Sequence, residues 1–220
     1  FEQIIAQAHP LASTAIEVIE GGRKVAGSAT FQAGLVELQD VASQAVVETL
    51  ALRKGQRILD YCAGGGGKAL ALAALADSAV DAWDSDAARM QDIAKRAERA
   101  GADITCLTEK PSGQYDIVLC DVPCSGSGAW RRAPQGKWLL TSERLTQLGN
   151  VQGDILQQAA RLVSPGGVLV YTTCSLLAQE NMDQLAKFTE ATPGWICDFS
   201  RQFLPIEGGD GFFVGHLRSV

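Results

Sequence analysis

Two cysteines stand where a predicted strand gives way to a polar loop. Cys124 lies in the segment Cys120–Gly128, and Cys174 lies in the segment Tyr171–Ser175. Each follows a short apolar run, which is typical of a buried parallel strand. Because the carboxyl ends of parallel strands face the ligand crevice, we expect both thiols at one edge of the sheet. Two thiols beside Asp121 and a Gly/Ser loop favour covalent chemistry over simple packing.

A run of glycines, Gly64 to Gly67, joins a predicted strand to a predicted helix and indicates a nucleotide site. Glycines let a ligand approach the backbone, and the helix amino terminus adds unpaired N–H groups. The phosphate-cradling motif does not fit, because Cys62 and Ala69 stand where it needs Gly and Ser/Thr. The dinucleotide pattern fits, with Asp84 after the next strand. S-adenosylmethionine is a further candidate, since it uses the same turn and an acid for the ribose hydroxyls.

Alternating apolar runs and amphipathic segments predict an α/β fold. We expect a doubly wound, mostly parallel seven-stranded sheet with an antiparallel closing strand. The expected strands are Arg57–Tyr61, Ala79–Trp83, Ile104–Leu107, Asp116–Cys120, Val168–Thr172, Trp195–Phe199 and Phe212–Leu217. The expected helices are Val41–Leu52, Ala69–Ala76, Ala87–Ala100, Ser142–Val163 and Ala178–Glu190. Asp40 and Asp86 are predicted helix caps, and Ser164–Gly167 is a predicted turn.

The first 30 residues are predicted to be a linker and hairpin, the remnant of a preceding region, and residues 31–220 to be one domain. In the hairpin, Ile16–Glu20 is expected to pair with Lys24–Ala26. The chain begins with Phe1 and not Met, which favours a fragment of a longer protein.

The formal net charge is −6, which argues against a generic, field-driven nucleic-acid binder. A local basic segment could still hold an RNA substrate. Cations and flat rings do gather after Cys124, at Trp130, Arg131, Arg132, Lys137 and Trp138. Such a mixture suits phosphates and unstacked bases, so the two arginines and Lys137 are predicted to bind RNA. For Trp138 the start of a buried helix face is the alternative.

The six cysteines contain no CxxC pair, so no metal site is expected. The sequence shows no secretion signal and no apolar run that could span a bilayer, so we expect free thiols in a reducing cytoplasm. Cys106, Cys120 and Cys197 are expected to be small buried hydrophobes. The histidines, His9 and His216, are expected to be ordinary surface or end residues.

Several motifs together resemble the Sun (Fmu) family of RNA cytosine-5 methyltransferases, and within it the bacterial members that act on small-subunit ribosomal RNA. The most specific signature pairs D-x-P-C-S-G, here Asp121–Gly126, with T-C-S, here Thr173–Ser175. Further matching motifs are Phe31–Gly34, Val36–Asp40, Cys62–Lys68, Arg131-Arg132, Lys137-Trp138, Glu180-Asn181 and Gly209–Phe213. The likeness runs from about residue 31 to the C-terminus and implies a Rossmann-like methyltransferase fold.

The resemblance implies an enzyme that transfers a methyl group from S-adenosylmethionine to C5 of a cytosine in RNA, which we expect to be ribosomal. It implies that the Cys174 thiolate adds to C6, that Cys124 assists product release and that Asp121 holds the base edge. Cofactor contacts are implied for Cys62, Ala63, Gly64, Gly65, Gly66, Gly67, Lys68, Asp84 and Asp121. It also implies a preceding helical RNA-binding domain, and we expect a monomer.

The glycine turn departs from the family pattern, in which Ala and Pro stand at the positions of Gly64 and Gly65. The turn therefore loses the rigidity of proline. An acid near the adenine is also common in the family, and here Glu109 alone could serve, one place out of register. Two rival functions stay open, a nicotinamide-dependent oxidoreductase and a non-catalytic RNA-binding relative. The oxidoreductase would need a proton-transfer residue in the crevice, where neither histidine is expected.

Overall fold

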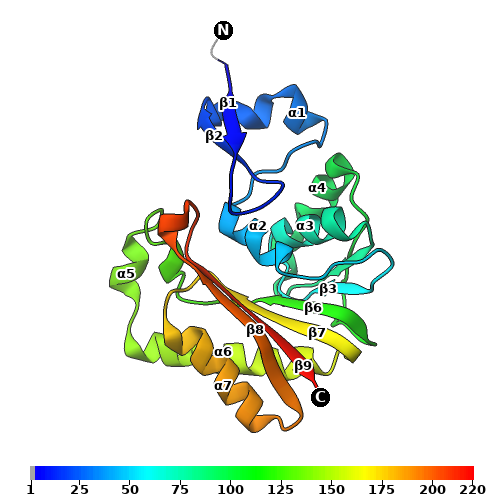
Figure 1. Cartoon of the computed structure of the whole chain (residues 1–220), viewed down its shortest axis with the longest axis vertical. Helices are drawn as coiled ribbons and strands as arrows, with labels where there is room; N and C mark the ends of the chain where they lie inside the picture. The colour runs from blue at the N-terminus through cyan, green and yellow to red at the C-terminus, as the bar shows by residue number, and fades with distance from the viewer. Residues whose placement is uncertain (1–2) are drawn as a thin grey trace.

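The computed structural model describes residues 3–220, which fold around a twisted β-sheet (Figure 1). In these residues, seven strands form the sheet: β3 (Ile58–Asp60), β4 (Val80–Ala82), β5 (Ile104–Cys106), β6 (Tyr115–Asp121), β7 (Val163–Thr173), β8 (Trp195–Phe203) and β9 (Phe212–Ser219). Their order is β5-β4-β3-β6-β7-β9-β8. β9 runs antiparallel to both neighbours, while β3 to β7 pair in parallel. The predicted fold class is confirmed.

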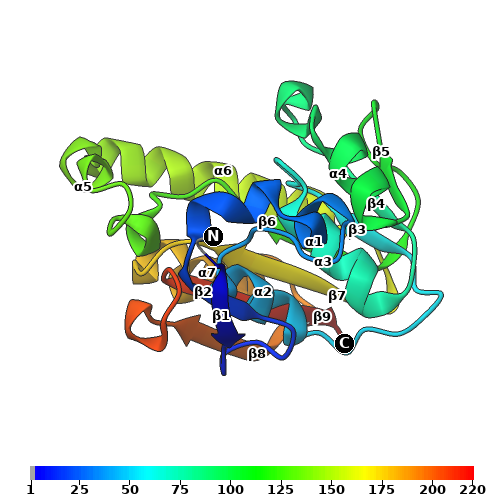
Figure 2. The ribbon, with the colours of Figure 1, turned by 90° about the horizontal axis from the view of Figure 1, so that it is seen from above.

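Helices cover both faces of this sheet (Figure 2). One face carries α2 (Val41–Glu48), α3 (Gly67–Ala76) and α4 (Ile93–Ala100), and the other carries α6 (Ser142–Ala160) and α7 (Met182–Ala191). Two short helices, α1 (Ala29–Gln32) and α5 (Gln135–Leu139), lie apart from these layers. Within the described residues, no helix combines the length and apolarity that a bilayer crossing needs.

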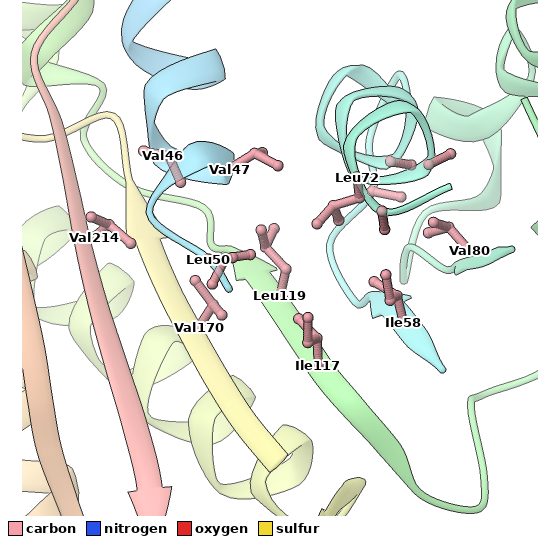
Figure 3. Close-up of a cluster of buried hydrophobic side chains, with 14 of the residues drawn as sticks. Val46, Val47, Leu50, Ile58, Leu72, Val80, Ile117, Leu119, Val170 and Val214 are labelled. Atoms are coloured by element: carbon pink, nitrogen blue, oxygen red, sulfur yellow. The ribbon is translucent and has the colours of Figure 1, made fainter. Parts of the chain in front are cut away.

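The core is divided by the sheet into two layers, because successive strand residues point to opposite faces. Ile117 and Leu119 pack in the layer of α2 and α3, whereas Val118 and Cys120 pack in the layer of α6 and α7. Figure 3 shows the first layer, with Leu72 of α3 above the strands. Truncating such a fully buried leucine to alanine costs about 2–5 kcal/mol. This packing fixes the strand ends that carry the candidate site.

Two predicted helices are each divided near their start. Ala87–Ala100 forms a 3₁₀ turn, η2 (Ala87–Met90), followed by α4. The Asp86 carboxylate accepts a 3.1 Å hydrogen bond from Ala88 N, so Asp86 caps η2. The segment Ala178–Glu190 likewise forms η4 (Ala178–Glu180) and then α7. The break falls at Asn181. Its side chain forms hydrogen bonds with Thr173 and Ser175, on either side of Cys174, and not with its own helix.

β7 begins earlier than predicted, because Val163 already pairs with Tyr115 and Val168 then pairs with Ile117. The predicted turn Ser164–Gly167 is therefore an irregularity within the strand. The predicted helix before it ends at Ala160 and not at Val163. The polar segment that precedes that helix contains two unpredicted helical stretches, the 3₁₀ helix η3 (Ser127–Ala129) and α5.

One strand of the predicted hairpin near the N-terminus, Ile16–Glu20, is confirmed, but its partner differs from the prediction. β1 (Ile5–Ala8) pairs antiparallel with β2 (Ile16–Glu20), so the predicted pairing of β2 with Lys24–Ala26 is wrong. The reason lies at Gly21, whose positive φ of 77° starts a 3₁₀ helix, η1 (Gly22–Gly27). A 3₁₀ helix bonds its own backbone and cannot supply a strand.

The loop between β1 and β2 packs against the main body. Ala12 and Ala15 are buried in the layer of α2, and Ser13 N donates a 2.8 Å hydrogen bond to Glu48 Oε1. The division of the chain at residue 30 stays a prediction. The first two residues, 1 and 2, lie outside the described part.

Candidate active site

A cavity of about 280 Å³ opens at the carboxyl ends of β3, β6 and β7. The wall is formed by the glycine turn, by strand-end acids, by Cys174 and by segments from both ends of the chain. The lining residues are Gln39, Asp40, Ser43, Asp60, Cys62, Ala63, Gly64, Gly65, Gly67, Lys68, Arg89, Asp121, Ala129, Arg132, Cys174, Asp210 and Phe212. The predicted convergence of the glycine turn with Asp121 and Cys174 is therefore present in the structure.

Two glycines give the turn after β3 its shape. Gly64 and Gly66 have positive φ of 48° and 80°, a region that favours glycine. Gly66 is the N-cap of α3 and does not line the cavity; a Cβ there would lie 2.8 Å from Ile93. The turn is thus set by backbone conformation and by packing against α4.

Asp84 lies behind this turn and not on the cavity wall. The buried Asp84 carboxylate accepts a 2.9 Å hydrogen bond from Gly64 N and forms a 3.0 Å ion pair with Arg89. In this structure Asp84 therefore supports the turn, while the predicted contact with ribose hydroxyls stays a prediction.

Asp60, which sequence reasoning did not select, ends β3 and lines the cavity with its side chain 1% exposed. Among the described residues, neither carboxylate oxygen has a partner in normal hydrogen-bond geometry. Burial and the charge of Asp121 raise the pKa of Asp60 to about 7, although Lys68 and the Cys62 backbone oppose this rise. A buried polar group without a partner is costly, which indicates a ligand contact. The sequence feature that could have identified Asp60 as a site residue is its position as an acid directly before the glycine turn.

Lys68 and Asp121 form one of the ion pairs that line the cavity. Lys68 Nζ donates a 2.7 Å hydrogen bond to Asp121 Oδ2, and the ammonium lies 4.6 Å from the Phe212 ring centroid. Lys68 is 6% exposed and Asp121 is 33% exposed. The lysine is thus held by the protein, whereas the aspartate keeps one side toward the cavity.

The two predicted active-site cysteines meet beside this pair. Cys124 Sγ lies 3.4 Å from Cys174 Sγ, and both residues are half-buried. The hydrogen bond with Cys124 lowers the pKa of Cys174; the nearby Lys68 charge acts in the same direction, while burial and Asp121 oppose it. The same hydrogen bond and burial raise the pKa of Cys124. Cys174 is therefore the sulfur that favours the thiolate, which is the nucleophilic form.

Glycines bring the backbones of the cysteine loops together. Gly128 N donates a 3.0 Å hydrogen bond to Cys174 O, and Gly211 N donates one of 3.0 Å to Gly128 O. A Cβ on Gly128 would lie 1.9 Å from Gly211 O. Only glycine can occupy this contact, which places the motif Gly209–Phe213 against the Cys124 loop.

The predicted RNA-binding cations are divided between the cavity and the surface. Arg132 Nε donates hydrogen bonds of 3.1 and 3.0 Å to the two carboxylate oxygens of Asp210, which is 1% exposed, and Arg131 lies 3.8 Å from the same carboxylate. Lys137 and Trp138 lie on α5, outside the cavity, with Trp138 81% exposed. A buried face for Trp138 is therefore excluded.

The remaining cysteines and histidines differ in part from expectation. Cys120 is fully buried as predicted, but Cys106 and Cys197 are only half-buried. His216 was expected near the surface and is 6% exposed, because β9 lies between β7 and β8. The His216 ring nitrogen contacts Thr49 Oγ1 at 2.9 Å, and burial lowers the pKa of His216 to about 4.

Comparison with known sequences identifies the family. A family model described as 16S rRNA methyltransferase RsmB/F matches residues 47–218. The ribosomal RNA small subunit methyltransferase B of Proteus mirabilis is 36% identical over 198 residues, which cover 86% of this chain and 47% of that protein. The enzyme of the same name from Xylella fastidiosa is 38% identical over 208 residues, covering 85% and 49%. The chain thus spans about half the length of these relatives.

Solved structures share the fold. The crystal structure of PH0851 has a TM-score of 0.90 and 26% identity, and the match covers 98% of this chain and 54% of that one. NSun6 from Pyrococcus horikoshii, crystallised with SFG, has a TM-score of 0.80 and 22% identity, with coverage of 94% and 59%. The family match extends over most of the chain and includes both cysteine loops, which confirms the predicted family. The chain belongs to the 16S rRNA methyltransferase RsmB/F family.

Proposed function

We propose that this chain transfers a methyl group from S-adenosylmethionine to C5 of a cytosine in RNA, through a covalent bond between Cys174 and C6. The observation that carries the proposal is the 3.4 Å approach of Cys174 to Cys124, with Cys174 on the wall of the cavity that holds the glycine turn. Small-subunit ribosomal RNA is the proposed substrate, because the curated relatives carry that name.

The polar groups of the cavity suit the cofactor. The cavity volume of about 280 Å³ lies just below the range typical of ligand pockets, which begins at about 300 Å³. Cys62 to Gly65 and Lys68 would hold the cofactor. The carboxylate of Asp60, which has no partner among the described residues, would accept hydrogen bonds from the cationic N–H donors of the cofactor. When bound, S-adenosylmethionine supplies an electrophilic methyl group on a sulfonium sulfur. Glycines at the turn allow this close approach, as the family pattern implies.

The chain's own groups support the remaining chemistry. C5 of cytosine is a poor nucleophile, and a thiolate bonded to C6 turns it into an enamine-like carbon. The Cys174 thiolate would form this bond, and Asp121 would hydrogen-bond the base near N3 and the exocyclic amine, stabilising the charge of addition. Lys68 orients Asp121 through its 2.7 Å hydrogen bond. Water then takes the C5 proton, the electron pair of the C5–H bond restores the C5–C6 double bond, and the bond between sulfur and C6 breaks. Cys174 leaves as a thiolate, a step that Cys124 would assist through its hydrogen bond.

The proposal is tested with labelled S-adenosylmethionine and small-subunit ribosomal RNA. Cys174→Ala should abolish methylation and leave binding of S-adenosylhomocysteine, measured by calorimetry, within about twofold. Cys197→Ala, which changes a cysteine far along the chain on β8, is the matched control and should keep full activity. Turnover by Cys174→Ala would contradict the proposal, and binding of NAD in place of S-adenosylhomocysteine would favour the oxidoreductase.

A further inference from the structure

The buried carboxylate of Glu180 collects hydrogen bonds from three separate segments. Glu180 ends η4 and is fully buried. It accepts hydrogen bonds from Ser125 N at 2.8 Å, Ser125 Oγ at 2.5 Å, Ser175 Oγ at 2.6 Å and Gln152 Nε2 at 3.1 Å. Within residues 3–220 it forms no ion pair with Lys, Arg or His, so neutral donors alone offset the cost of burying its charge.

The two serines each follow an active-site cysteine directly. Ser125 comes after Cys124 and Ser175 comes after Cys174. Both hydroxyls donate to the same oxygen, Oε2 of Glu180, so one atom contacts both cysteine loops, in addition to the direct hydrogen bond from Gly128 N to Cys174 O. The loop of Cys124 has a further link to this centre, because Gln152 Nε2 also donates to Pro123 O at 3.0 Å.

We propose that Glu180 is a positioning residue that sets the separation of the Cys124 and Cys174 sulfur atoms. The inference rests on the proposed function, since that separation allows Cys124 to assist release of the product from Cys174. Glu180 touches neither sulfur in a hydrogen bond; it acts through the two serines. Its family motif, Glu180-Asn181, is thereby given a physical role in this chain.

The geometry predicts that glutamine would be a poor replacement for Glu180. Ser125 N can only donate, and the two hydroxyls and Gln152 Nε2 also donate here. A Gln side chain offers one acceptor oxygen and turns an NH₂ group toward donors. We expect Glu180→Gln to fold, because its shape is unchanged, and to hold the two loops less closely.

The first experiment measures sulfur separation without RNA. Phenylarsine oxide bridges two nearby thiols and releases one water, and peptide mapping identifies the bridged pair. The wild-type chain should form the Cys124–Cys174 bridge, and Glu180→Gln should form it about 10-fold or more slowly. Glu190→Gln, an exposed glutamate on α7, is the matched control and should bridge at the wild-type rate. Equal bridging by Glu180→Gln would overturn the inference whether or not the chain methylates RNA.

The second experiment measures product release. Glu180→Gln should accumulate a gel-stable covalent RNA complex and lower turnover about 10- to 100-fold, while its affinity for S-adenosylhomocysteine changes less than about twofold. Adding Glu180→Gln to Cys124→Ala should slow release no further, because both act through the same thiol. Additive effects, or a loss of cofactor affinity in parallel with turnover, would overturn the inference. If Glu180→Gln does not fold, Ser125→Ala tests the same contact and should slow bridging.

Discussion

Lys68 Nζ lies 2.7 Å from Asp121 Oδ2, and the lysine is more deeply buried than its partner. Asp121→Asn keeps the shape of the side chain but removes the charge that Lys68 faces. We expect turnover to fall about 100- to 1,000-fold, as for loss of an aligned stabilising group. Because Lys68 would keep a buried charge without a counter-ion, the unfolding temperature should also fall. Wild-type turnover in Asp121→Asn would show that Asp121 does not hold the base.

Cys124→Ala should trap the enzyme on RNA. The 3.4 Å contact places the Cys124 thiol where it can assist departure of Cys174, so its loss should leave the sulfur–carbon bond intact after methylation. Denaturing gels should show a covalent complex with labelled RNA. The double variant Cys124→Ala/Cys174→Ala provides the control and should give no complex. A complex that persists without Cys174 would assign the nucleophile elsewhere.

Asp60 should make the free protein less stable as the pH rises. Folding raises the pKa of Asp60 from 3.8 to about 7, so the folded chain binds a proton that the unfolded chain has lost. The stability that this group contributes is fully present below about pH 4 and is lost as the pH rises through 7. The resulting loss in the free energy of unfolding is no more than about 4 kcal/mol. Chemical unfolding of Asp60→Asn between pH 5 and 8 should lack this decline and show weaker binding of S-adenosylhomocysteine. A parallel pH profile in wild type and variant would contradict the prediction.

Gly128→Ala should disrupt the contact between the Cys124 loop and the loop before β9. The added Cβ would lie 1.9 Å from Gly211 O, so one of the two backbones must move. We expect lower thermal stability and a methylation rate at least about 10-fold lower. Gly27→Ala serves as the control, because a Cβ there meets no atom within 4 Å. Full activity of Gly128→Ala would show that the loop tolerates displacement.

The sequence predicted the meeting of Cys124, Cys174 and Asp121 because each follows a parallel strand, and such strands end at one edge. It did not predict that His216 is buried, because the last strand inserts between β7 and β8, and this pairing is not local in the sequence. The sequence also could not predict that the carboxylate of Asp60 has no hydrogen-bond partner in the described residues. That state depends on Lys68 turning to Asp121, which only side-chain geometry reveals.

Local turn chemistry explains the other differences. Gly21 looked like the centre of a hairpin, but its positive φ starts a 3₁₀ helix and leaves β2 to pair with residues before it. Asn181 looked like the interior of a helix, but Thr173 Oγ1 donates a 2.6 Å hydrogen bond to its side chain and interrupts that helix. In the first case a local backbone conformation overrides the sequence pattern, and in the second a side-chain hydrogen bond from a residue eight positions earlier does so.

The half-buried position of the two thiols limits how a nucleotide can reach them. Cys174 lies in a cavity formed by three strand ends, a glycine turn and Asp210, with helices covering both faces of the sheet. A cytosine that stays paired and stacked in a duplex cannot present C6 to such a recess. Entry therefore requires a base rotated out of its helix, and unpaired loops or transiently opened RNA should be methylated faster than stable duplexes.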